Sequence, residues 1–321
     1  MSKNLKEVLT IGRYFKNKFG EKVYKIPISI SGFTCPNIDG TKAKGGCSFC
    51  ENDSFSSNLQ EKKTKFKLNP NIEHNPFLEN QLKQLEMQFI ATKKRLENKF
   101  KAKKFIVYFQ SFTNTYAPLS TLKALYEKAL SFDDVIGLSI GTRTDCVTDE
   151  ILDFLYEKSK EKEIWIEYGI QSFFQTTLDK INRADDVENM RYWIRITKEK
   201  GLNVCGHLIY GLPDENQEMM LETFKQTIDL KVDSIKFHPL YVVKNTLLTN
   251  EFKKGRFTPI SEELYIDTVV KSIINLPQNV SVQRVTAGID DDTLLSPLWC
   301  KNKHQQMKKI RVALEEKGFI Y

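Results

Sequence analysis

The strongest constraint on the fold is an alternation of strand-like and helix-like segments along most of the chain. Short runs rich in β-branched and aromatic residues are each followed by an amphipathic stretch, which is typical of β-α units around a parallel sheet. Six strands are predicted, at Val23–Ser31, Lys104–Gln110, Val135–Gly141, Ile164–Gln171, Asn203–Tyr210 and Ser234–Leu240. Apolar residues at helical spacing predict helices at Leu119–Leu130, Thr148–Lys160, Val187–Lys200 and Glu215–Leu230. The 321 residues suit a single α/β barrel with an appendage.

Two regions interrupt this alternation. Residues 33–67 are rich in Gly, Asn, Ser and Lys and form an irregular stretch longer than a compact domain tolerates without a role. Beyond Tyr241, a helix near Ser261–Leu276, a strand at Val280–Val285 and a basic helix from about Lys303 are predicted. We therefore expect an N-terminal helical segment over 1–22, a partial barrel over 23–242 that contains a loop at 32–67, and a C-terminal extension over 243–321.

The composition is typical of a globular protein outside the membrane, with 40% hydrophobic and 28% charged residues. No apolar run approaches the roughly 20 residues that a membrane helix needs. The charged N-terminus does not resemble a signal peptide, so we expect a cytoplasmic protein whose six cysteines stay reduced. The net charge of +7 is concentrated in Lys62–Lys67, Lys93–Lys104 and Lys301–Arg311. These basic runs suit a polyanionic partner, or they are solvated helix faces.

Three cysteines gather in the first irregular region. Eleven residues separate Cys35 from Cys47, and two separate Cys47 from Cys50. A Cys-x-x-Cys turn can direct two thiolates to one metal centre, and three thiolates on a cubane leave one iron open to a ligand. The alternatives are a zinc site completed by His74 or another donor, unligated cysteines, and a redox pair formed by Cys47 and Cys50.

The chain resembles the radical S-adenosylmethionine superfamily, in particular the YhcC/YtqA-type proteins of its Elongator-like branch. An aromatic residue, Phe49, directly precedes the last cysteine of the cluster loop, as it does in that superfamily. The long gap before Cys47 departs from the usual Cys-x3-Cys-x2-Cys spacing but occurs in the Elongator-like branch. The likeness is carried by TCPNIDGTKAKGGCSFC, YFQSFTNTYAP, SIGTRTDCV, EYGIQS, GHLIYGLPDE and KFHPLYVVKNT.

The resemblance implies the fold, the cofactors and the metal ligands. The implied fold is a partial (β/α)6 TIM-like barrel with a small C-terminal α/β extension. A [4Fe-4S] cluster would be held by Cys35, Cys47 and Cys50, with S-adenosylmethionine on its open iron and the ring of Phe49 near the adenine. Reduction would come from an external donor of the flavodoxin or ferredoxin type.

Polar residues follow the second predicted strand, where parallel α/β enzymes build their sites. Gln110, Ser111, Thr113 and Asn114 stand where other members use a Gly-Gly-Glu motif, so the resemblance implies hydrogen bonds to the amino group of S-adenosylmethionine. A plain loop with a turn-forming Asn114 is the alternative.

Charged residues lie at the ends of the next two strands. Arg143 and Asp145 could clamp a ligand carboxylate or form a structural ion pair. Glu167 and Gln171 are four residues apart on one strand and share a side of it. Because a buried carboxylate needs a partner, Glu167 should bind something, with ribose hydroxyls or the methionine group as the implied targets and an ion pair with Arg143 as the alternative.

The last two predicted strands end in three further candidates. Gly211, in the GHLIYGLPDE motif, resembles the element that passes its backbone along the adenine, although an ordinary turn also explains it. His238 and Tyr241 approach the mouth of the site and are candidates for contact with substrate. Among the other cysteines, Cys146 and Cys205 are interpreted as structural, and Cys300 as a candidate functional thiol.

The resemblance also implies the reaction. YhcC/YtqA-type proteins resemble MnmL-type enzymes, which act on the wobble uridine of tRNA and convert 5-carboxymethylaminomethyluridine to 5-aminomethyluridine. A 5′-deoxyadenosyl radical would take hydrogen from the carboxymethyl group before that group is lost. The basic runs are consistent with tRNA as partner. The alternatives are a radical enzyme acting on a small molecule or protein, and a zinc-stabilised RNA-binding protein without catalysis.

Overall fold

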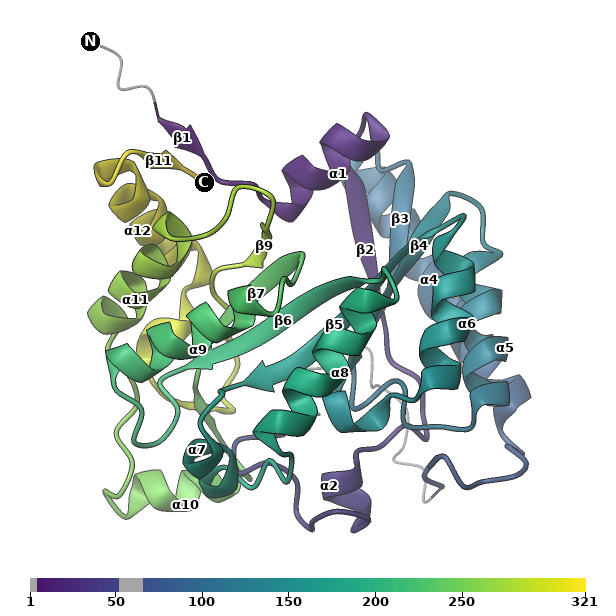
Figure 1. The fold of residues 1–321 in the computed structure, drawn as a ribbon, viewed down its shortest axis with the longest axis horizontal. Helices are drawn as coiled ribbons and strands as arrows, with labels where there is room; N and C mark the ends of the chain where they lie inside the picture. Colours follow the sequence, from purple (N-terminus) through teal and green to yellow (C-terminus); the bar gives the residue numbers. More distant parts are fainter. Residues whose placement is uncertain (1–4, 52–65) are drawn as a thin grey trace.

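A sheet of seven parallel strands forms the centre of the molecule in the computed structural model, which describes residues 5–51 and 66–321. The strands run in chain order: β2 (Val23–Ile28), β3 (Lys104–Phe109), β4 (Val135–Thr142), β5 (Glu163–Gln171), β6 (Asn203–Tyr210), β7 (Ser234–Pro239) and β9 (Ser281–Arg284). The sheet curls into a half-barrel (Figure 1). The predicted α/β fold and its six strands are confirmed. The seventh strand comes from the segment that we assigned to the C-terminal extension.

Helices cover the convex face of the sheet. They are α4 (Leu78–Phe100), α5 (Leu119–Leu130), α6 (Asp149–Ser159), α8 (Val187–Glu199), α9 (Gln217–Asp229) and α11 (Glu262–Ile274). Local signals set their ends: the Thr148 hydroxyl caps α6 by accepting from the amide of Ile151, and Gly201 follows α8 with a φ of +82°. Sequence analysis missed α4, whose buried Leu85 and Phe89 are embedded among charged residues.

The interior of the half-barrel is layered, because alternate residues of each strand point inward. The layer nearest the amino-terminal ends of the strands is apolar. There, Ile106, Trp165 and Cys205 pack against Phe15 of α1 (Ile11–Phe19), which closes this end of the half-barrel. Cys205 is thus a buried structural residue, as expected. Above it lies a charged layer around Glu167, and above that a cavity at the carboxyl ends of the strands.

The remaining elements lie at the ends of the chain and beside the cavity. β1 (Lys6–Glu7) pairs with β11 (Phe319–Ile320), so the two ends of the described chain meet (Figure 1). After β7, β8 (Val242–Val243) pairs with β10 (Leu294–Ser296). The short helices are α2 (Pro36–Asp39), α7 (Gln175–Lys180), α10 (Leu247–Lys253), η1 (Thr144–Cys146) and η2 (Leu298–Lys301); α12 (Lys303–Glu316) is the basic C-terminal helix.

Two of the three basic runs lie in described parts of the chain. In the run Lys93–Lys104, Lys93 pairs with Asp134 at 2.7 Å and Lys104 with Glu21 at 3.4 Å, so part of this run is structural. Most of the run Lys62–Lys67 lies outside the described residues. No helix in the described ranges has the length and apolar character needed to span a membrane.

Candidate radical site

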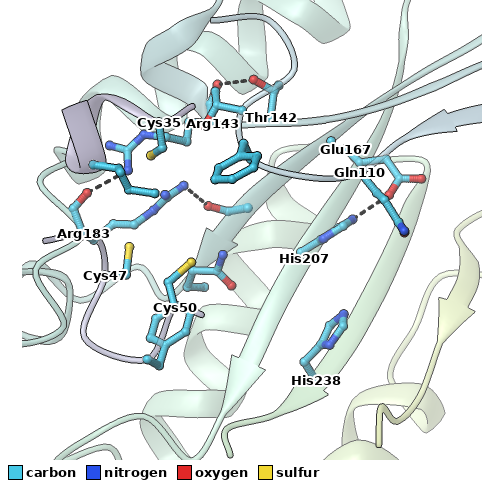
Figure 2. Close-up of a pocket in the computed structure, with 18 of the residues that line it drawn as sticks. Cys35, Cys47, Cys50, Gln110, Thr142, Arg143, Glu167, Arg183, His207 and His238 are labelled. Atoms are coloured by element: carbon cyan, nitrogen blue, oxygen red, sulfur yellow. Dashed lines mark hydrogen bonds and ion pairs between the residues drawn. The ribbon is translucent and has the colours of Figure 1, made fainter. Parts of the chain in front are cut away.

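A cavity of about 310 Å³ opens at the carboxyl ends of the strands (Figure 2). The loop after β2 contributes all three clustered cysteines to its lining, and the strand ends and following loops contribute the polar side chains. Of the predicted site residues, those that line it are Cys35, Cys47, Phe49, Cys50, Gln110, Thr113, Arg143, Glu167, Gln171, His238 and Tyr241. Residues that lie up to about 250 positions apart in the sequence thus meet in one cavity, as expected for parallel strands.

The three cysteines are half-buried and form no disulfide with any described residue. Cys35 directly precedes α2, and a turn in which the amide of Cys50 donates to the carbonyl of Cys47 at 2.9 Å brings the other two together. Burial, followed by the negative charge of Cys47 and Cys35, raises the pKa of the Cys50 thiol to about 12. A bound cation would offset both effects, so the donor set suits a metal centre with thiolate ligands.

The cysteine loop is held in position by hydrogen bonds to the segment between α7 and α8. Asn37 Nδ2 donates to the carbonyls of Asn182 at 2.8 Å and Arg183 at 2.7 Å, and Asn182 Nδ2 donates back to the carbonyl of Gly46 at 2.7 Å. The Ser48 amide donates to the carbonyl of Ile181 at 2.8 Å. Gly46 has a φ of +76°, which a residue with a side chain rarely adopts. These contacts hold the loop against the segment between α7 and α8.

The zinc alternative finds no support in the geometry. His74 is exposed and does not line the cavity. A zinc ion with thiolate bonds of about 2.3 Å requires its sulfur atoms to lie roughly 4 Å apart. Within the described residues, the trio of candidate ligands whose atoms lie within 4.8 Å of one another is Glu167, Cys205 and His207, not the three loop cysteines. The wider spacing of the loop thiols suits a multi-iron cluster better than a single ion.

Arg143 forms a structural ion pair with Asp145, which is one of the two alternatives that the sequence allowed. Its Nε and Nη2 atoms donate to the two carboxylate oxygens of Asp145, each at 2.7 Å. Burial opposes ionisation of Asp145, but the hydrogen bonds and the charge of Arg143 outweigh it and hold the pKa of this carboxyl well below its usual range. Arg143 Nη1 also donates to the carbonyl of Arg183 at 2.9 Å. The guanidinium of Arg143 is thus hydrogen-bonded to groups of the protein itself.

Arg183 is a lining residue that sequence analysis missed. It is 5% exposed, and its Nη2 donates to the carbonyl of Gly169 at 2.6 Å. Its Nε has no hydrogen-bond partner among the described residues. Arg183 lies in the connection between α7 and α8 and not at a strand end, so the strand-end rule could not find it. A buried guanidinium with a free N–H at the cavity is suited to an anionic ligand group.

Four of the predicted candidates, Ser111, Asn114, Gly211 and Cys300, do not line the cavity. Ser111 is buried, with its hydroxyl 2.5 Å from that of Ser29. Asn114 donates its side-chain amide to the carbonyl of Gly141 at 2.9 Å and is buried. Gly211 has a φ of +88°, and a Cβ there would lie 2.7 Å from Ile260, so close packing explains the glycine. Cys300 is fully buried in a small apolar cluster that includes Tyr241 and Val243, where burial raises the pKa of its thiol.

Glu167 is the centre of the charged layer and not a partner of Arg143. Its Oε1 accepts from Lys25 Nζ at 2.5 Å and from the Ser139 hydroxyl. Its Oε2 accepts from Lys236 Nζ and from His207 Nε2, the latter at 2.8 Å. Burial would raise the pKa of Glu167, but the charges of Lys236 and Lys25 hold it well below its usual value. Every lone pair of this carboxylate is thus engaged within the protein, which leaves no free oxygen for ribose.

A half-barrel of parallel strands whose first loop brings three cysteines to a cavity at the strand ends is the arrangement of a radical S-adenosylmethionine enzyme. Residues 39–227 match the Radical SAM superfamily, and residues 232–316 match the Radical_SAM C-terminal domain. Because the first match spans more than half of the chain, the protein belongs to the Radical SAM superfamily. Its cofactors are accordingly a [4Fe-4S] cluster and S-adenosylmethionine.

Full-length relatives place the chain more narrowly within the superfamily. It is 35% identical to YtqA of Bacillus subtilis over 96% of this chain and 90% of that relative. It is also 35% identical to YhcC of Escherichia coli, over 98% of this chain and 94% of that relative. A tRNA uridine(34) acetyltransferase of Methanocaldococcus infernus is 25% identical over 58% of this chain and 36% of its own. The solved archaeal Elp3 of the same organism has the same fold, with a TM-score of 0.58 and 19% identity over 92% of this chain and 64% of its own.

Proposed function

We propose that this radical enzyme modifies the wobble uridine of tRNA and converts 5-carboxymethylaminomethyluridine to 5-aminomethyluridine. The observation that carries the proposal is a basic groove beside the cavity. The groove has a volume of about 750 Å³ and is lined by β9, the segment that follows it, and α12. Arg284 lines both the groove and the cavity. A polyanion that is bound in the groove therefore lies next to the radical site.

The basic side chains of this groove have no carboxylate to neutralise them. Lys303, Lys308 and Arg311 line it, and none of them has an acidic oxygen within 4.0 Å among the described residues. Glu315 is the one acidic residue in the lining. By contrast, Lys309 of the same helix pairs with Glu262 at 2.5 Å and does not line the groove. Unpaired cations along one helix face suit the phosphates of an RNA strand.

Within the cavity, the cysteine loop would hold the cofactors. Cys35, Cys47 and Cys50 would ligate the cluster, and Phe49 would lie against the adenine. When bound, the cluster and S-adenosylmethionine supply a 5′-deoxyadenosyl radical, a strong abstractor of hydrogen atoms. Gln110, Thr113 and Gln171 offer hydrogen bonds to the cofactor, and the free Nε–H of Arg183 suits its carboxylate.

The proposal includes two partners that act in the cytoplasm. The tRNA is the substrate, in line with the relative named as a tRNA uridine(34) acetyltransferase. The electron comes from an external donor of the flavodoxin or ferredoxin type. Nucleoside mass spectrometry of tRNA from a deletion strain tests the reaction: 5-carboxymethylaminomethyluridine accumulates and 5-aminomethyluridine is lost if the proposal holds. An unchanged wobble profile would refute it for that organism.

The double variant Lys308→Gln/Arg311→Gln is expected to weaken tRNA binding about tenfold at moderate salt and to lower the salt slope of log Kd by about two, because two phosphate contacts are lost. Filter binding across a salt series measures both quantities. Lys309→Gln is the matched control, since Lys309 is on the same helix but outside the groove. Equal effects of the double variant and the control would contradict an RNA-binding groove.

A further inference from the structure

The cavity has a polar end that lies away from the cysteines. Figure 2 shows Cys35, Cys47 and Cys50 on one side of the cavity and His207 and His238 on the other. The two histidine rings lie with their centroids 6.1 Å apart and their planes at 28°. Arg284 joins them from β9, and its Nη1 lies 3.3 Å from His238 Nε2. This end therefore presents a guanidinium and an imidazole to whatever lies across from the cluster loop.

Positive charge exceeds negative charge at this end. Glu167 is the only acidic residue in the described lining, and Lys25, Lys236, Ser139 and His207 already occupy its oxygens. Arg284 has no carboxylate within 4.0 Å among residues 5–51 and 66–321. A guanidinium without a counter-charge in a partly desolvated site is costly, and a bound anion removes the cost.

The hydrogen-bond pattern fixes which atoms can donate to that anion. A guanidinium has no acceptor, so Arg284 donates to His238 and the Nε2 of His238 accepts. Burial, and then the charge of Arg284, lower the pKa of His238 well below its usual value, so the ring is neutral and its proton is on Nδ1. The Nδ1–H of His238 points away from Arg284, because the two ring nitrogens face different directions. His238 thus holds the guanidinium in place, and the remaining N–H groups of Arg284 are left to donate. The planar fork of a guanidinium matches a carboxylate.

We propose that Arg284, held in place by His238, forms a subsite that binds the carboxylate of the substrate at the end of the cavity opposite the cysteine loop. This rests on the proposed function for the identity of the substrate, whose carboxymethyl group carries such a carboxylate. The subsite explains how the enzyme recognises a uridine that carries the group to be removed. The product, a protonated amine, has no carboxylate for Arg284, so it dissociates.

Binding of three anticodon stem-loops tests the subsite. They carry 5-carboxymethylaminomethyluridine, its primary amide, or unmodified uridine, and are titrated anaerobically against the iron-loaded protein. The wild type should bind the acid about tenfold more tightly than the amide. Arg284→Gln should remove this preference, so that the acid and the amide bind with equal affinity. Arg284→Lys keeps the positive charge but lacks the planar guanidinium, so it should retain part of the preference for the acid over the amide. Arg195→Gln, at an exposed position of α8, is the matched control.

Two results would overturn the subsite. One is equal binding of acid and amide by the wild type. The other is a uniform loss of affinity for all three stem-loops in Arg284→Gln, because Arg284 would then contact the RNA backbone through the groove that it also lines.

A binding experiment without RNA distinguishes failure of the subsite from failure of the proposed function. Equilibrium dialysis with N-methylglycine should show millimolar binding that its primary amide, which lacks the carboxylate, does not show and that Arg284→Gln abolishes. If this binding is seen while tRNA is neither bound nor converted, the carboxylate subsite stands and the tRNA proposal fails. If tRNA is converted but neither N-methylglycine nor the acid stem-loop is preferred over its amide, the subsite fails alone.

Discussion

Cys47→Ala is expected to abolish binding of the iron–sulfur cluster while the barrel stays folded. One of the three thiolates of the cavity is lost, and two thiolates do not hold a cubane firmly. The fold survives because the loop lies outside the sheet and its position depends on Asn37, Asn182 and Ser48. Iron and sulfide content after anaerobic reconstitution, together with far-UV circular dichroism, measures both parts of this result.

Cys300→Ala is the matched control for that variant. Cys300 is a buried thiol outside the cavity lining, so the variant should bind iron as the wild type does. If Cys47→Ala loses its secondary structure, the metal is structural and the site is not an independent loop on a folded barrel. If Cys47→Ala keeps its full complement of iron, Cys47 is not a ligand.

Glu167→Gln is expected to lower the free energy of unfolding by about 3–5 kcal/mol, because it leaves Lys25 and Lys236 buried without their shared counter-charge. Burial already lowers the pKa of Lys25 to about 8 despite the carboxylate. In the unfolded chain this lysine keeps its ordinary value of 10.5, so the unfolded state binds more protons between these values and stability rises with pH there. Without the carboxylate the pKa of Lys25 falls further in the folded variant, so the variant gains stability at lower pH than the wild type does. Its deficit should therefore narrow as the pH rises toward about 8 and stay constant above that value.

Urea unfolding monitored at several pH values measures this effect. Glu163→Gln is the control on the same strand: Lys18, its cationic partner, has 48% of its side chain exposed, so solvent can replace the lost carboxylate. Its cost should be about 1 kcal/mol. A Glu167→Gln variant as stable as the wild type would show that the lysines are hydrated or neutral in the folded protein.

The strand order and the location of the site could be predicted from the sequence because both depend on local patterns. Strand-like runs with helices between them define a parallel sheet, and the carboxyl ends of its strands define where polar residues gather. Gln110, Thr113, Arg143 and Gln171 were found in this way and line the cavity. The helix α4 was missed because its buried face is masked by many charged residues.

The partners of charged residues could not be predicted, because they depend on the curl of the sheet. The sequence allows an ion pair between Arg143 and Glu167, but Arg143 instead pairs with its neighbour Asp145. The partners of Glu167 are Lys25 and Lys236, which come from strands far along the chain in either direction. Arg183 and Arg284 were missed for a similar reason, since one lies on a connection and the other on a strand that we had placed outside the barrel.

One reaction in vitro tests the proposed conversion of the wobble uridine. The reconstituted protein is incubated anaerobically with S-adenosylmethionine, a low-potential reductant and tRNA that carries 5-carboxymethylaminomethyluridine, and both 5′-deoxyadenosine and the wobble nucleosides are quantified by mass spectrometry. We expect 5-aminomethyluridine to appear together with 5′-deoxyadenosine, and neither product to form with Cys47→Ala. Formation of 5′-deoxyadenosine with no change in the wobble nucleoside, or of neither product by the iron-loaded wild type, would contradict the proposed conversion.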